Sequence, residues 1–167
     1  MNSSNPKDMA LGAIVLGEIG RVMDISTLKG VANTAFDLIS HAESDVRNAG
    51  SHALGTMTVG NISFFFPQLV SFMHSPDANV FLLMLSLKEV IICEKGEMKD
   101  ISSFVDILFE HASHPEENVR NTVAECIGKL FIRHGEDVAT SMIDKEVFTT
   151  NNLLLLETVA RSLKFAC

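Results

Sequence analysis

The chain has 167 residues, of which 47% are hydrophobic, and this is enough for one ordinary domain with a substantial core. Thirteen Lys and Arg against twenty-one Asp and Glu give a net charge of −8, which repels a phosphate backbone and excludes nucleic acid as the expected direct ligand. No apolar run is long enough for a membrane-spanning helix, so a membrane protein is not expected.

Residues 1–8 are polar and contain Pro6, and they predict a disordered lead-in before a single helical domain over 9–167. Hydrophobic periodicity, broken by Gly, Pro, Asp and Ser, then predicts a series of short helices. In chain order these are expected at 9–21, 27–41, 46–59, 62–74, 78–94, 99–112, 118–134, 136–143 and 153–165. The series opens with a second helix and closes without a cap, so we expect incomplete end repeats, and self-association through apolar ends.

An aliphatic residue that follows a smaller side chain recurs through the chain, with gaps of 38, 33, 40 and 36 residues. These positions are Leu16, Leu54, Leu87, Ile127 and Leu163. A period of this length is typical of stacked helix pairs. We expect the five residues to pack between repeats, with the small neighbours allowing second helices to approach closely.

The strongest internal match pairs DVRNAGSHALG (45–55) with NVRNTVAECIG (118–128). A Val-Arg start to the second helix favours HEAT repeats over tetratricopeptide repeats, whose Trp and Tyr pattern is absent. The sequence therefore predicts an all-α fold, an α-α superhelix of the HEAT/armadillo solenoid type, with about five repeats of which the first and last are incomplete.

Arg47 and Arg120 occupy equivalent positions, beside Asp45 and Glu117. They could contact a partner, but an intramolecular arginine–carboxylate ladder that fixes one repeat on the next is the favoured interpretation.

Lys88, Glu89, Glu125 and Lys129 are charged residues on predicted second helices, which usually line the concave side of a solenoid. They could form a mixed-charge groove for a partner helix. A solvated helix face explains them equally well, since Glu125 and Lys129 are also spaced for a helical ion pair.

His111 and His114, with Glu110 and Cys126 nearby in sequence, lack the further ligands of a zinc site, and we expect these histidines to end a helix instead. The residues 64–66, all Phe, are expected in the core. No catalytic motif is present, so neither an enzyme nor a cofactor is predicted.

Three cysteines, Cys93, Cys126 and Cys167, are odd in number and far apart. Reduced thiols are therefore expected, together with a cytoplasmic or nuclear location.

Four segments carry a closer resemblance: LGEIGRVMDIS (16–26), SHALGTMTVGN (51–61), LLMLSLKEVI (82–91) and NVRNTVAECIGKL (118–130). In their order and spacing the chain resembles the cullin-associated, neddylation-dissociated proteins, which are very long HEAT-repeat solenoids, and looks like part of their C-terminal third. The resemblance implies a partner, an unmodified cullin bound at its N-terminal region, and a role in exchanging substrate receptors on cullin–RING ubiquitin ligases. The alternatives are a transport or adaptor scaffold with another partner, and an enzyme on a HEAT-like fold.

Overall fold

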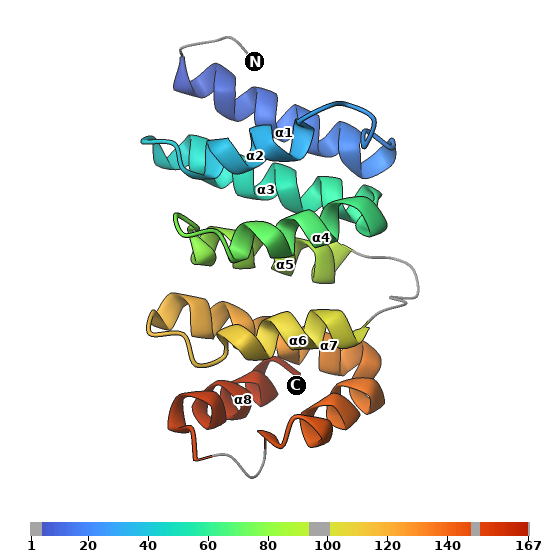
Figure 1. Cartoon of the computed structure of the whole chain (residues 1–167), viewed down its shortest axis with the longest axis vertical. Helices are drawn as coiled ribbons and strands as arrows, with labels where there is room; N and C mark the ends of the chain where they lie inside the picture. Colours follow the sequence, from blue (N-terminus) through green and yellow to red (C-terminus); the bar gives the residue numbers. More distant parts are fainter. Residues whose placement is uncertain (1–4, 94–100, 148–150, 167) are drawn as a thin grey trace. The chain divides into compact units, whose positions relative to one another are not determined.

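The computed structural model describes residues 5–93, 101–147 and 151–166, which form α-helices joined by short turns (Figure 1). No β-strand occurs in these three ranges. The chain divides into two compact units, Met1–Cys93 and Glu94–Cys167. The predicted all-α, HEAT-type fold class is confirmed.

The first unit has two layers of helices. Helices α1, α3 and α5 follow one another in one layer, because α3 packs against both α1 and α5, while α2 and α4 lie against that layer (Figure 1). The helices are α1 (Pro6–Val22), α2 (Val31–Ile39), α3 (Ser44–Gly60), α4 (Ile62–Met73) and α5 (Val80–Cys93). Each of α3 and α5 is thus the second helix of a pair, as the repeat predicts.

Two helix starts differ from the expected ones. The first helix begins at Pro6, where the side chain of Asn5 accepts a hydrogen bond from the Lys7 main-chain N at 3.1 Å. Part of the expected lead-in 1–8 is therefore the first turn of α1, and residues 1–4 lie outside the described residues. Helix α2 starts only at Val31, because Gly30 before it has a φ of 77°, a left-handed conformation that a right-handed helix cannot include.

The core of the first unit uses the predicted face of α3. Val46, Ala53, Leu54 and Met57 have no exposed surface, because α1, α2 and α5 surround α3. The prediction for the three consecutive Phe residues is only partly right. Phe65 is fully buried, Phe66 is half-buried and Phe64 is 42% exposed, since neighbouring positions on one helix point in different directions.

The second unit contains α6 (Ile101–His111), α7 (Glu117–Asp144) and α8 (Leu153–Ala166). Helix α7 packs against both α6 and α8. Two helices were expected where α7 runs, and the predicted break is present as a kink: His134 has φ −137° and ψ 42°. A local departure from helical geometry, rather than a loop, therefore redirects the chain.

The repeated aliphatic residues differ in burial. Leu54, Leu87 and Ile127 are at most 1% exposed, and Leu16 is half-buried. Leu163 is 57% exposed, because α8 packs mainly on α7 through its other side. The expected packing role of Leu163 is therefore not seen within its own unit.

Second helices approach each other through the small residues beside these aliphatic ones. The glycine after one aliphatic residue faces the small residue before the next. A Cβ atom on Gly17 would lie 2.7 Å from Ala53 Cα, one on Gly55 would lie 2.8 Å from the Ser86 main-chain O, and one on Gly128 would lie 2.6 Å from the Ser162 main-chain O. Any side chain at these glycines would push the helices apart.

Within the described part of the chain, none of the helices combines the length and the apolar character that crossing a membrane requires.

Candidate functional site

The two equivalent arginines are clamps on the turn that precedes their own helix. Arg47 Nη1 donates to the main-chain oxygens of His41 at 2.9 Å and Ala42 at 2.6 Å. Arg120 Nη1 donates in the same way to His114 O at 2.7 Å and Pro115 O at 2.9 Å.

The predicted arginine–carboxylate ladder is therefore corrected. The acceptors of both guanidinium groups are carbonyl groups of the same repeat, and neither arginine forms an ion pair with a residue in the described ranges. These carbonyls lie where the first helix of the pair ends and have no helical partner of their own, so a cationic donor stabilises them.

A buried pair of serines joins α3 to α5. Ser51 Oγ donates to Leu82 O at 2.7 Å, Ser86 Oγ donates to Ser51 O at 2.8 Å, and the two hydroxyl oxygens are 3.2 Å apart. Both side chains are at most 3% exposed. Because each of the two buried hydroxyl groups has a hydrogen-bond partner on the other helix, the pair holds α3 and α5 in a fixed register beside the Gly55 contact.

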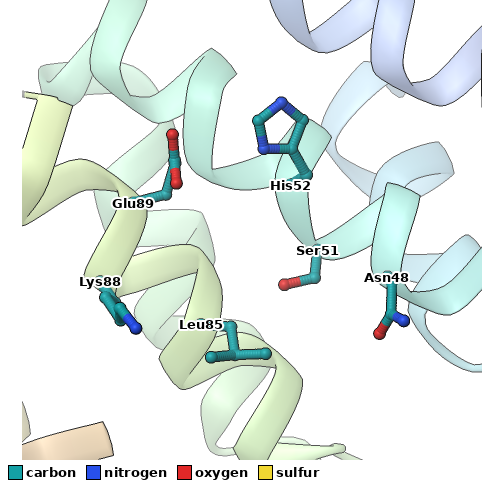
Figure 2. Close-up of a pocket in the computed structure, with 6 residues that line it drawn as sticks. All are labelled: Asn48, Ser51, His52, Leu85, Lys88 and Glu89. Atoms are coloured by element: carbon teal, nitrogen blue, oxygen red, sulfur yellow. The ribbon is translucent and has the colours of Figure 1, made fainter.

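A hollow of about 240 Å³ opens between α3 and α5, next to the serine pair (Figure 2). Three residues on each helix line it, and Figure 2 shows Ser51 between His52 and Asn48 on α3. The lining residues are Asn48, Ser51, His52, Leu85, Lys88 and Glu89. Lys88 and Glu89, two of the four predicted partner-binding residues, therefore lie at a concave place on the layer of second helices.

Charged groups continue from this hollow onto α1. His52 Nε2 lies 3.4 Å from Glu18 Oε1, and Arg21 Nη2 lies 2.7 Å from Glu18 Oε2. On α5, Cys93 Sγ donates to Glu89 Oε1 at 3.0 Å. Burial, the hydrogen bond to Glu89 and the negative charge of Glu89 together raise the pKa of the Cys93 thiol to about 11. The thiol is therefore a protonated hydrogen-bond donor at neutral pH.

Glu125 and Lys129, the other two predicted residues, are half-buried and one turn apart on α7 of the second unit. The four predicted residues are thus divided between the two units. A shared groove formed by all four stays a prediction.

In the second unit, Arg161 of α8 reaches across to α7. Its Nη1 donates to Asn121 Oδ1, and the same atom lies 3.6 Å from Glu117 Oε1. Neither this contact nor the site residues Asn48 and Leu85 were predicted from the sequence. Aligning the two repeats on Ser86 and Ser162 would have revealed them. In this alignment Arg161 precedes Ser162, whereas Leu85 precedes Ser86.

His111 and His114 lie at the end of α6 and in the turn that follows it, as the sequence predicts. His111 is the last residue of α6, and its ring centroid lies 6.1 Å from that of His114. His114 Nδ1 accepts a hydrogen bond from Glu116 N at 3.1 Å, and Cys126 is fully buried in α7. Throughout the described ranges, no group of three or more His, Cys, Asp or Glu is placed to hold a metal ion.

Cys93 and Cys126 are both free thiols, whereas Cys167 lies outside the described residues.

Comparison with known proteins supports the resemblance to the cullin-associated, neddylation-dissociated proteins that the sequence shows. No protein-family model matches the chain. Cullin-associated NEDD8-dissociated protein 1 of Arabidopsis thaliana is 30% identical over 146 residues, which are 84% of this chain and 12% of that protein. The Drosophila melanogaster protein of the same name is 28% identical over 172 residues, covering 99% of this chain and 14% of that protein.

A third relative is named as a C-terminal part of such a protein. The C-terminal part of cullin-associated NEDD8-dissociated protein 1 from Emericella nidulans is 25% identical over 130 residues, or 77% of this chain and 12% of that protein. The chain thus spans only about an eighth of the curated relatives that it matches. It is similar to a C-terminal-type segment of the cullin-associated NEDD8-dissociated proteins.

Proposed function

We propose that the chain is a protein-binding segment of a regulator that controls the assembly and exchange of substrate receptors on cullin–RING ubiquitin ligases. The observation that carries this proposal is similarity along most of the chain to proteins whose names state that they are cullin-associated. The proposed partner is a cullin that lacks the NEDD8 modification, bound at its N-terminal region. The proposed location is the cytoplasm, the nucleus or both.

The proposed mechanism is steric and involves neither catalysis nor a cofactor. The layer of second helices presents the polar residues Glu18, His52, Lys88 and Glu89 on one side of the first unit. A partner that covers this layer would exclude a competitor from the same surface. The net charge of −8 favours a basic surface on the partner, mainly through the association rate and the register of binding.

A pull-down with the immobilised 167-residue chain tests the proposal. Purified cullin–RING complex is offered at micromolar concentration, in one arm unmodified and in the other carrying NEDD8. Retention of the unmodified complex alone is expected. If neither form is retained, the cullin assignment fails for this chain, and a HEAT scaffold for another protein partner becomes the better interpretation.

Paired charge reversals locate the binding surface. Glu89→Lys, in the hollow, is expected to lower retention of the unmodified cullin, because it replaces a negative charge that favours a basic partner. Asp77→Lys makes the same change of charge at an exposed residue in the turn between α4 and α5, and it should leave retention unchanged. Equal effects of the two variants would place binding elsewhere or reduce it to overall charge.

We further propose self-association through the exposed apolar side of α1. Leu11, Val15, Ile19 and Val22 are 63%, 49%, 42% and 73% exposed, and their spacing puts them along one side of the helix. Sedimentation velocity over a range of concentrations should show oligomers that Val15→Ser with Val22→Ser removes. A monomer at every concentration would contradict this.

A further inference from the structure

The two units contain equivalent contacts between second helices, and they differ at one chemically important position. Gly55 of α3 faces Ser86 of α5, just as Gly128 of α7 faces Ser162 of α8. Positions on α3 and α7 therefore correspond with an offset of 73 residues, and positions on α5 and α8 with an offset of 76. Under this alignment the equivalents of Asn121 and Arg161 are Asn48 and Leu85.

In the second unit, the space between the aligned positions on α7 and α8 is filled by the guanidinium group of Arg161. Arg161 donates to Asn121 Oδ1 and lies 3.6 Å from a carboxylate oxygen of Glu117. The Arg161 side chain is 32% exposed, so most of it is sheltered between α7 and α8. Amide and carboxylate oxygens side by side are suitable acceptors for the planar donor fork of arginine.

In the first unit the same place is open. Leu85 cannot donate a hydrogen bond, and the side chain of the exposed Asn48 makes none with any residue in the described ranges. The hollow of about 240 Å³ lies here, with Asn48 on one helix and Leu85 on the other (Figure 2). It thus combines an available amide oxygen, an apolar side chain and, from Glu89, a carboxylate.

We propose that this hollow binds an arginine side chain of a protein partner. The guanidinium group donates to Asn48 Oδ1, as Arg161 does to Asn121, and its apolar stem packs on Leu85. Lys88 and Glu89 offset each other in charge, so the negative charge of the whole chain favours a cation. The inference deepens the proposed function by naming the chemistry that the hollow recognises, and it rests on that function for a protein to supply the arginine.

Arginine and citrulline derivatives provide a direct test without a cullin. The full chain is titrated with N-acetyl-arginine amide at millimolar concentration while the Asn48 side-chain amide signals are followed by NMR. A saturable shift is expected for the arginine compound and not for N-acetyl-citrulline amide, which has nearly the same shape without the positive charge. No saturable shift, or equal shifts with both compounds, would overturn the inference.

A reciprocal exchange between the units supplies matched variants. Leu85→Arg places the guanidinium group in the chain itself, so it should abolish the Asn48 response to added arginine. Arg161→Leu should open the equivalent place and create a new response at Asn121. If Leu85→Arg keeps the Asn48 response, or Arg161→Leu produces none at Asn121, the equivalence of the two sites is wrong.

The outcome also separates this inference from the proposed function. Retention of unmodified cullin together with no arginine response would overturn the arginine site alone. An arginine response in a chain that retains no cullin would overturn the cullin assignment and leave the site standing.

Discussion

The main-chain oxygen of Ser86 lies so close to Gly55 that a Cβ atom on Gly55 would be 2.8 Å from it. Ordinary contacts of a Cβ atom with a backbone oxygen are longer, and a backbone atom cannot rotate away as the end of a side chain can. Gly55 therefore sets how near α3 and α5 lie, and the hollow beside them depends on that separation.

Gly55→Ala should lower the free energy of unfolding by about 1–3 kcal/mol, the usual cost of overpacking a tight contact. This loss should appear even though alanine favours a helix over glycine by about 1 kcal/mol. Urea denaturation followed by circular dichroism measures it. The control is Gly135→Ala, whose Cβ would lie 3.6 Å from the Phe131 ring and should not destabilise the chain. Equal stabilities of the two variants would show that α3 and α5 separate freely.

The serine pair should behave as a coupled unit. Ser86→Ala leaves buried acceptors of α3 and α5 with fewer donors, at a cost of about 1 kcal/mol. Because Ser51 and Ser86 hydrogen-bond to each other's residues, the double variant should cost less than the sum of the single ones. A double-mutant cycle in urea measures the coupling, and strictly additive losses would contradict it.

Removal of a turn clamp should loosen the turn that it holds. Arg47→Met loses two hydrogen bonds from a charged donor to carbonyls, and it should cost about 1.5–3 kcal/mol. Hydrogen exchange read by mass spectrometry should show faster exchange in the amides that follow His41. Arg21→Met removes an exposed ion pair with Glu18 instead, and should cost only about 0–1 kcal/mol. Similar losses in both variants would argue against the clamp.

The Cys93 thiol should react slowly with iodoacetamide at pH 8, because its pKa is raised to about 11 and little thiolate is present. Glu89→Gln removes the negative charge that helps to raise this pKa, so alkylation should become faster. Mass spectrometry of the peptide that contains Cys93 measures the rate. An unchanged rate in the variant would exclude Glu89 as a cause.

The raised pKa of Cys93 also makes the stability of the folded chain depend on pH. The folded chain holds the Cys93 proton more tightly than the unfolded chain does. The contribution of this thiol to the free energy of unfolding is therefore complete below the ordinary thiol pKa, and it is lost as the pH rises towards about 11. Urea midpoints of the chain and of Cys93→Ser across this range should converge as the pH rises.

The helices follow from hydrophobic periodicity, and their ends depend on features that the pattern shows less clearly. The start of α2 is set by the left-handed Gly30, which could be seen in the sequence only as a glycine within an expected helix. The break near residue 134 was correctly located, but periodicity cannot distinguish a kink at His134 from a loop. Local backbone geometry decides both cases.

The candidate site was less predictable. Arg47 and Arg120 stand out in the sequence, but their acceptors are main-chain oxygens, which every residue has and no sequence pattern reveals. Lys88 and Glu89 were found by charge and helix position. Leu85 was overlooked, because a leucine on a helix suggests packing, and only its equivalence to Arg161 shows that a donor is missing there.

The turn clamps also bear on how such a chain can diversify. The hydrogen bonds described above for each guanidinium group go to the main chain of its turn, where a histidine, His41 or His114, is the first acceptor in both repeats and Ala42 of one repeat is Pro115 in the other. The side chain at the second acceptor position is thus left unconstrained by the group that fixes the course of the turn. A duplicated helix pair can therefore accept a substitution at that position while keeping the angle at which its two helices meet.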